Sequence, residues 1–191
     1  MVLMPSIELS NEEQQVCLHV ARESIRHGLE KGNALHINTS DYSAKLQQHA
    51  ASFVTLHKHG ELRGCIGALE AYQPLINDIS EHAFAAAFQD PRFPRLEENE
   101  YNDIEVDISV IGLPETIIFE SEEDLLKKIR PDIDGLILEF GYNRGTFLPS
   151  VWEQLPDKKE FLEHLKMKAG LPMHWWDNKV KISRYETFSF E

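Results

Sequence analysis

A cysteine flanked by two glycines stands in the hexapeptide LRGCIG, which spans residues 62–67. Glycine has no Cβ, so Gly64 and Gly67 would let a ligand or a partner chain approach the backbone beside Cys65. A free thiol has a pKa near 8.5, so nucleophilic attack by Cys65 would need a nearby cation to lower that pKa. Arg63 is the obvious cation, because residues 63 and 65 share one face of a regular strand, although a bulge at either glycine would change this geometry.

The same hexapeptide also has a purely structural interpretation. Cys65 would then be a small buried hydrophobic residue, and the two glycines would make room for an alanine-rich helix. The residues alone leave both interpretations open. Residues 64–67 also spell the GxxG of KH domains, but that motif joins two helices, whereas these residues belong to a predicted strand.

A second constellation is Asp90-Pro91-Arg92. An aspartate before proline is biased toward an extended backbone, and Asp90 would hold the guanidinium of Arg92 in position to bind a carboxylate or a phosphate. The pair would equally well tie a loop to the end of the preceding helix, as many surface ion pairs do. His82, in that helix, would act as a general base if it met Cys65, and is otherwise a surface or hydrogen-bonded core histidine.

The histidines do not predict a metal centre. His57 and His59 alternate at the end of a predicted hairpin without a neighbouring carboxylate or thiolate, which makes them a poor ligand set and favours solvated turn residues. The sequence also lacks the Walker A, GxGxxG, HExxH and GxSxG motifs. The common signatures of NTPases, dinucleotide-dependent oxidoreductases, zincins and serine hydrolases are therefore missing, and we assign no cofactor.

Hydrophobic periodicity predicts the helices and strands that would position these residues. The predicted helices span residues 10–32, 74–90, 121–129 and 157–170. The predicted strands span residues 51–57, 61–69, 104–110, 135–140 and 146–148, with a final strand region over 180–188. Short turns join neighbouring strands, so hairpins dominate, and the order favours an α+β fold with antiparallel sheets over a doubly wound parallel sheet.

The composition limits the class of protein. The chain has 191 residues, of which 42% are hydrophobic, enough for one substantial core or two unequal lobes. The net charge of -13 repels nucleic-acid backbones and anionic membranes, so a nucleic-acid role would need a local basic patch. The chain has two cysteines, Cys17 and Cys65, which predict no disulfide framework. The sequence has no leader-like or membrane-spanning run, so we expect a cytoplasmic protein.

Several stretches together resemble the AMMECR domain family. They are LRGCIG at 62–67, AAAFQDPRF at 85–93, ISV at 108–110, GTFLP at 145–149, FL at 161–162 and KAGL at 168–171. Their order and spacing agree with that family from about Leu18 to Tyr185. The resemblance implies a single domain over residues 1–191, with a larger lobe that holds both termini and a smaller lobe. It also implies an antiparallel sheet in each lobe and a cleft between them that the hexapeptide faces.

The resemblance implies partners as well, although the family has no established reaction. Its prokaryotic members are component A of the so-called AmmeMemoRadiSam system, which implies a MEMO-like protein and a radical-SAM enzyme as companions. The Gly-Cys-Ile-Gly context and this resemblance together favour the functional interpretation of the hexapeptide. We therefore expect an enzyme, or a component of one, that acts on a small molecule in the cleft. Its catalytic candidates are Cys65 and His82, and its ligand-binding candidates are Arg63, Gly64, Gly67, Asp90 and Arg92.

Two other classes of function stay open. A non-catalytic adaptor would use the glycine-rich strand edge and exposed aromatic residues to dock a protein partner. A nucleotide-binding or RNA-binding module would need a basic face built from Arg63, Lys158, Lys159, Lys166 and Lys168. The acidic composition makes nucleic acid an unfavoured ligand, and no membrane is expected as a partner.

Overall fold

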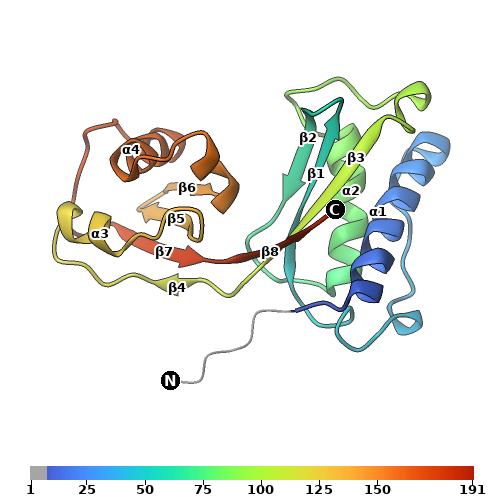
Figure 1. Ribbon diagram of the computed structural model, residues 1–191, viewed down its shortest axis with the longest axis horizontal. Helices are drawn as coiled ribbons and strands as arrows, with labels where there is room; N and C mark the ends of the chain where they lie inside the picture. Colours follow the sequence, from blue (N-terminus) through green and yellow to red (C-terminus); the bar gives the residue numbers. More distant parts are fainter. Residues whose placement is uncertain (1–7) are drawn as a thin grey trace. The chain divides into compact units, whose positions relative to one another are not determined.

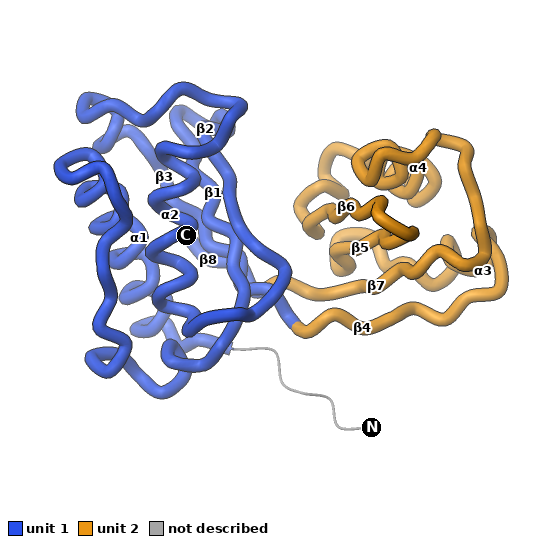
Figure 2. The backbone as a smooth tube through the Cα atoms, turned by 180° about the vertical axis from the view of Figure 1, so that it is seen from behind, with its two compact units in different colours: residues 1–112, 188–191 blue, residues 113–187 orange. Residues whose placement is uncertain are grey.

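The computed structural model describes residues 8–191, which form two compact units (Figure 2). Unit 1 comprises the chain up to Gly112 together with Phe188–Glu191, and unit 2 comprises Leu113–Thr187. Each unit combines helices with one four-stranded antiparallel sheet. This confirms the predicted α+β fold with antiparallel sheets. The cleft that the family resemblance implies between two lobes stays a prediction.

Unit 1 is a sheet with two helices on one of its faces (Figure 1). The sheet has the order β2-β1-β3-β8, so β2 lies at one edge. Its strands are β1 (Ala51–Lys58), β2 (Glu61–Gly67), β3 (Ile104–Ile111) and β8 (Thr187–Phe190). Its helices are α1 (Asn11–Lys31) and α2 (Leu75–Phe88), and two short 3-10 helices span Thr39–Asp41 and Glu98–Glu100.

Helix α1 begins at the capping box that the sequence predicts. Ser10 Oγ accepts a hydrogen bond from the backbone N of Glu13 at 3.2 Å, and Glu13 Oε2 accepts one from the backbone N of Ser10 at 2.9 Å. At the other end, Gly32 has a φ of 78°, a left-handed conformation that favours glycine. Between these ends, Ala21 and Ile25 are fully buried.

The two helices bury one face of the sheet in unit 1. Val54 and Leu56 of β1 and Ile108 of β3 are fully buried in one cluster with Ile79 and Ala83 of α2. Strand side chains alternate between faces, so the intervening residues lie on the opposite face, which neither helix covers (Figure 1). We call it the polar face, and it carries Thr55, His57, Cys65, Asp107 and Ser109.

Unit 2 holds the other sheet, in the order β4-β7-β5-β6. Its strands are β4 (Glu115–Thr116), β5 (Gly135–Phe140), β6 (Asn143–Phe147) and β7 (Lys181–Tyr185). Its helices are α3 (Glu122–Lys128) and α4 (Lys158–Lys168), with a 3-10 helix over Pro149–Glu153. Asp157 caps α4, because its Oδ1 accepts hydrogen bonds from the backbone N of Lys159 at 2.9 Å and of Glu160 at 3.0 Å.

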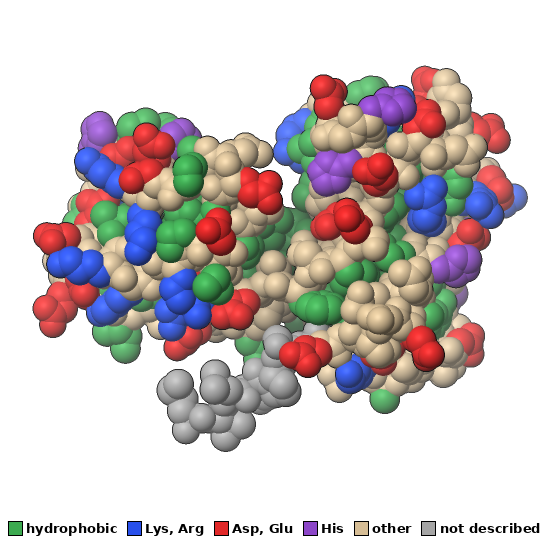
Figure 3. Space-filling view, in the orientation of Figure 1, with side chains coloured by type: hydrophobic (Ala, Val, Ile, Leu, Met, Phe, Trp, Pro, Cys, Tyr) green, Lys and Arg blue, Asp and Glu red, His purple; other side chains and the backbone are tan. Residues whose placement is uncertain are grey.

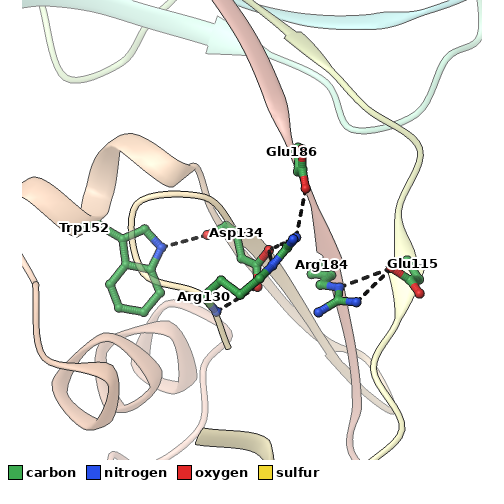
Figure 4. Close-up of polar contacts among 6 residues, drawn as sticks. All are labelled: Glu115, Arg130, Asp134, Trp152, Arg184 and Glu186. Atoms are coloured by element: carbon green, nitrogen blue, oxygen red, sulfur yellow. Dashed lines mark hydrogen bonds and ion pairs between the residues drawn. The ribbon is translucent and has the colours of Figure 1, made fainter. Parts of the chain in front are cut away.

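The core of unit 2 combines aromatic rings with one buried carboxylate. Trp152 stacks on Phe161 with ring centroids 3.7 Å apart, and its Nε1 donates to the carbonyl oxygen of Asp134 at 2.8 Å. The carboxylate of Asp134, which has no exposure, accepts from the backbone N (2.9 Å), Nε (2.9 Å) and Nη2 (2.6 Å) of Arg130 (Figure 4). Arg130 Nη2 also reaches Glu186 at 2.9 Å. These bonds give the buried carboxylate the partners that its desolvation requires.

The C-terminal strand region differs from the prediction. Residues 180–188 are predicted as one strand region, but the structure divides them between β7 and β8, which belong to different sheets. Strand β4 is also missing from the prediction, because two residues are too few to show a period. It pairs with β7, and Arg184 of β7 donates to Glu115 Oε2 from Nε at 3.2 Å and from Nη2 at 3.1 Å (Figure 4).

Candidate functional site

Strand β2 contains a bulge at Arg63. Gly64 faces Leu56 of β1, but the next residue of β1, His57, faces Leu62, so Arg63 is an extra residue without a partner on β1. An extra residue in one strand interrupts the regular alternation of side chains between the two faces. The bulge therefore decides on which side of the sheet the Arg63 side chain lies.

Arg63 is held by Glu100 and is not placed beside Cys65. Its Nε donates to Glu100 Oε1 at 3.1 Å and its Nη2 to Oε2 at 2.8 Å, and the Nζ of Lys58 donates to Oε1 at 2.9 Å. Lys58 is on the same face of β1 as buried Leu56, so this ion-pair cluster lies on the helix-covered side. The hydrogen bond from Arg63 is the main reason that the pKa of Glu100 falls to about 2. Arg63 is 8% exposed, and its Nη1 is a buried donor without a partner among the described residues.

Cys65 lies in a row of side chains that crosses three strands on the polar face. It faces Thr55 of β1, and Thr55 faces Asp107 of β3. Thr55 Oγ1 donates a hydrogen bond to Cys65 Sγ at 3.1 Å. Burial raises the pKa of the Cys65 thiol, and the hydrogen bond from Thr55 and the charge of Arg92 offset this rise only in part. Cys65 is therefore a protonated thiol at neutral pH.

Asp90 joins the loop that follows α2 to the edge strand β2. Its Oδ2 accepts from the backbone N of Cys65 at 2.9 Å and from Nη2 of Arg92 at 2.7 Å. Its Oδ1 accepts from the backbone N of Arg92 at 3.1 Å and from Nε at 3.0 Å. The side-chain hydrogen bond from Arg92 is the largest of the causes that lower the pKa of Asp90. The structure thus brings Asp90, Arg92 and Cys65 together, and Arg92 is the cation beside Cys65.

Neighbouring parts of unit 1 fill the space at the two hexapeptide glycines. A Cβ at Gly64 would lie well under 3.0 Å from the backbone carbonyl oxygen of Ala86 in α2. A Cβ at Gly67 would lie equally close to the ring of Phe53 and the carbonyl oxygen of Ser52 on β1. Both glycines therefore permit close packing within the fold, as in the structural interpretation of the hexapeptide. Their part in ligand binding stays a prediction.

His82 is a hydrogen-bonded core histidine. It is 7% exposed, and its Nδ1 lies 3.0 Å from Oδ2 of Asp78, one turn earlier in α2. The same oxygen accepts from the backbone N of Ser52 at 2.8 Å and from its Oγ at 2.6 Å. The described residues include no hydrogen bond or ion pair between His82 and Cys65. The general-base role of His82 stays a prediction that this arrangement does not support.

Asp107 is a candidate site residue that the sequence analysis does not single out. It lies in the row with Thr55 and Cys65 and is half-buried. Burial raises the pKa of its carboxyl group, and repulsion from Glu191 adds to the rise. Its side chain accepts one long hydrogen bond, at 3.5 Å, from Oγ of Ser109. The alternating pattern of β3 indicates the wet face for this residue, but its place in line with Cys65 depends on the order of the strands.

Neither a metal centre nor a membrane span is found within residues 8–191. No group of three or more His, Cys, Asp and Glu side chains in this range is placed to hold a metal ion. No helix in it is both long and apolar enough to cross a bilayer. A surface hollow of about 550 Å³ in unit 1 lies between α1 and residues 96–102, and none of the predicted site residues lines it. The candidate site is the Cys65 end of the polar face, because Cys65, Asp90 and Arg92 come together there.

Comparisons with known proteins agree on one family. A family profile described as AMMECR1 matches residues 18–190. A protein of Methanothermobacter thermautotrophicus is 39% identical over 184 residues, which cover 95% of this chain and 95% of that protein. Protein MJ0810 of Methanocaldococcus jannaschii is 39% identical over 187 residues, covering 96% of this chain and 92% of that one. The crystal structure of an uncharacterised protein, PH0010 of Pyrococcus horikoshii, matches with a TM-score of 0.87 and 32% identity, covering 95% and 92% of the two chains.

Proposed function

The chain belongs to the AMMECR1 family, and on this basis we propose that it is a small-molecule-binding protein, either an enzyme or a component of one. Its ligand places an anionic group at Arg92 beside Cys65. The solved relative is itself described as uncharacterised, so the proposal rests on the geometry of the site and not on a relative's activity. The site as proposed lies within unit 1.

One observation carries the proposal: the guanidinium of Arg92 is held in place and yet is accessible. Asp90 accepts hydrogen bonds from Nε and Nη2 of Arg92, at 3.0 and 2.7 Å. The nitrogen that would bind a ligand carboxylate or phosphate is therefore Nη1. The Arg92 side chain is 55% exposed, so a ligand would reach it without displacing Asp90. Because the side chain is already ordered, binding loses little conformational entropy.

In this proposal Cys65 contacts the ligand as a neutral thiol. Burial raises the pKa of Cys65, which leaves little thiolate for an unassisted nucleophile at neutral pH. The backbone N of Cys65 is already bonded to Asp90, so the sulfur is the part of this residue that remains for a ligand. A catalytic role for Cys65 would require a base, and the hydrogen bond of His82 goes to Asp78.

The proposal includes the companions that the family resemblance implies, a MEMO-like protein and a radical-SAM enzyme. In such a system this chain would bind the small molecule, and the companions would carry out the chemistry. We propose no cofactor for the chain itself. The support for these partners is the resemblance alone, so the test below records companion subunits and small molecules separately.

Native mass spectrometry of the protein purified from its own host tests the proposal. The wild type is expected to retain an anionic small molecule, and Arg92→Gln is expected to lower its occupancy at least about tenfold, because a charged hydrogen bond is lost. Arg95→Gln removes another exposed cation of the same loop and serves as the matched control. Equal retention by Arg92→Gln and the wild type would overturn the assignment of Arg92. A companion subunit retained without any small molecule would favour the adaptor.

The adaptor alternative has one structural feature in its favour. Strand β2 is an edge strand and its Leu62 is 41% exposed, so a partner strand would find a free edge there. However, Asp90 accepts from the backbone N of Cys65 and Arg92 donates to its carbonyl oxygen at 3.4 Å, which blocks the middle of that edge. Affinity purification with Leu62→Asp tests docking at this exposed edge, and unchanged recovery of a companion would argue against it.

The RNA-binding alternative loses the basic face that it needs. Lys166 is 1% exposed and forms an ion pair with Glu122, and Arg63 is buried in its ion pair with Glu100. On the face of the molecule in Figure 3, acidic side chains stand among the lysines and arginines of the described chain. Without Arg63 and Lys166 on such a face, the net charge of -13 repels a phosphate backbone.

A further inference from the structure

We propose that the ligand of this site is zwitterionic, with its anionic group at Arg92 and a protonated amino group at Asp107. This inference rests on the proposed function, because it takes the ligand anion at Arg92 as given and adds a site for the ligand's positive charge. The middle of the ligand lies over Cys65 and Thr55. The chemical class that fits is a small amino carboxylate or amino phosphate with its two charges well separated.

Arg92 and Asp107 lie at the two ends of one row of side chains across the sheet. Arg92 donates to the backbone of Cys65 on β2, Thr55 follows on β1, and Asp107 follows on β3. Neighbouring strands lie about 4.8 Å apart, so the Cα atoms of Cys65 and Asp107 are separated by roughly 10 Å. An extended chain of a few methylene groups spans a distance of this order.

Asp107 is a half-buried carboxylate that has no ion-pair partner among residues 8–191. The buried or nearly buried carboxylates Asp78, Asp90 and Glu100 of the same unit each bond to a neighbouring histidine, arginine or lysine. Asp107 forms no ion pair within the described chain, and its one hydrogen bond, from Ser109, is long at 3.5 Å. Its desolvation is therefore largely uncompensated, which is the condition that a ligand cation relieves.

The charges around Asp107 also favour a cation. Burial raises the pKa of its carboxyl group, and the negative charge of Glu191 raises it further, whereas His57 lowers it. A protonated amine at this position offsets both the burial and the repulsion, in the way that Arg92 does for Asp90. At the opposite end of the row, Nη1 of Arg92 is the donor that its ion pair with Asp90 leaves for a ligand anion, so the two ends select opposite signs.

Cys65 lies between Arg92 and Asp107, and its reactivity depends on the charge of each. The charge of Arg92 lowers the pKa of its thiol, and the charge of Asp107 raises it. Three methanethiosulfonate reagents measure this field: the anionic sulfonatoethyl, the cationic trimethylammonioethyl and the neutral methyl compound. In each reaction the thiolate attacks the divalent sulfur of the reagent, the bond from that sulfur to the sulfonyl sulfur breaks, a disulfide forms and methanesulfinate leaves. Peptide mapping distinguishes Cys65 from Cys17, which has no exposure.

The measured quantity is the rate of each charged reagent divided by the rate of the neutral one in the same variant, which cancels changes in the thiolate fraction. Arg92→Gln is expected to lower the anionic ratio, and Asp107→Asn the cationic ratio, each at least about threefold at low ionic strength. Arg95→Gln and Glu30→Gln are the matched controls, because they remove exposed charges from the same loop and from helix α1 on the covered side of the sheet. They are expected to leave both ratios within about 1.5-fold of the wild type.

Protection of Cys65 by model compounds tests the ligand class directly. At equal concentration, 6-aminohexanoate is expected to slow modification by the neutral reagent at least about threefold more than hexanoate or hexylamine does. Asp107→Asn is expected to remove the advantage of 6-aminohexanoate over hexanoate. Circular dichroism of each variant verifies that the fold is retained.

The outcomes separate this inference from the proposed function. An unchanged cationic ratio in Asp107→Asn, or protection that is equal for all three compounds or missing for all three, overturns the zwitterionic ligand. The anion site at Arg92 stands in that case if Arg92→Gln lowers the anionic ratio. An unchanged anionic ratio in Arg92→Gln, or a Cys65 that resists all three reagents, overturns the proposed function and this inference with it.

Discussion

The carbonyl oxygen of Ala86 in α2 occupies the space in which a side chain at Gly64 of β2 would lie. Glycine at this position lets the edge strand pack directly against the backbone of the helix. The same strand carries Cys65, and the loop after the same helix carries Asp90 and Arg92. The contact therefore sets the distance between the two segments that form the candidate site.

Gly64→Ala is expected to lower the free energy of unfolding by about 2–4 kcal/mol, because the new methyl group meets a backbone oxygen that moves only with α2. Urea unfolding followed by far-UV circular dichroism measures this loss, and hydrogen exchange of α2 and β2 peptides locates it. Gly60→Ala in the turn of the same hairpin is the comparison, since a Cβ there meets nothing within 4 Å. Its φ of 80° costs alanine about 1 kcal/mol. Equal losses in the two variants would contradict the packing account.

Alkylation of Cys65 by iodoacetamide is expected to show an apparent pKa above about 8.5, the value of a free thiol, because burial disfavours the thiolate. Arg92→Gln is expected to raise this pKa further, since it removes a positive charge beside the sulfur. The measurement is the alkylation rate as a function of pH, resolved by peptide mass. Cys17, whose pKa burial raises to about 12, is the internal control and stays unmodified in the folded protein. An apparent pKa below that of a free thiol would restore Cys65 as a nucleophile.

Acid is expected to remove the stabilising effect of Glu100. Its pKa falls from an ordinary 4.5 to about 2 in the folded chain, so this contribution is complete above pH 4.5 and is lost as the pH falls toward 2. The wild type is expected to exceed Glu100→Gln by about 3 kcal/mol in unfolding free energy at neutral pH, with the difference shrinking toward zero at low pH. Urea unfolding at several pH values measures it. Glu98→Gln, at an exposed position of the same 3-10 helix, is expected to keep the acid dependence of the wild type.

Asp134→Asn is expected to destabilise unit 2 by about 2–4 kcal/mol, because it weakens three hydrogen bonds from Arg130 to a carboxylate without exposure. Glu186→Gln removes the exposed partner of the same guanidinium and is expected to cost less than about 0.5 kcal/mol. All 3 tryptophans of the chain lie in unit 2, so their fluorescence during urea unfolding reports on this unit. Similar losses in the two variants would show that burial of the carboxylate does not determine the loss of unfolding free energy.

The helices and most strands follow from local patterns in the sequence. The capping box at Ser10 and the apolar spacing after it predict α1, and Asp157 marks the start of α4. The turn predicted at His59-Gly60 forms with both residues at positive φ, 54° and 80°, which is the backbone of a tight hairpin turn. These features depend on residues within a few positions of one another, which is why a single sequence reveals them.

The candidate site is only partly visible in the same patterns. Residue types and spacing indicate Cys65, Asp90 and Arg92, and the structure brings these three together. The spacing also predicts Arg63 beside Cys65, but the bulge directs Arg63 to Glu100. Asp107 is not selected, because its neighbours in the row come from strands far apart in the sequence.

Short-range periodicity in the sequence was enough to predict the α+β class and the positions of the helices and hairpins. Side-chain chemistry was enough to single out Cys65, Asp90 and Arg92 as candidates. Which charged side chains meet depended on tertiary packing. Strand order placed Asp107 in line with Cys65, the extra residue in β2 turned Arg63 away, and the approach of α2 filled the space at Gly64. These outcomes depend on which distant segments pack together and in which register, and a one-residue change of register moves a side chain to the other face of the sheet.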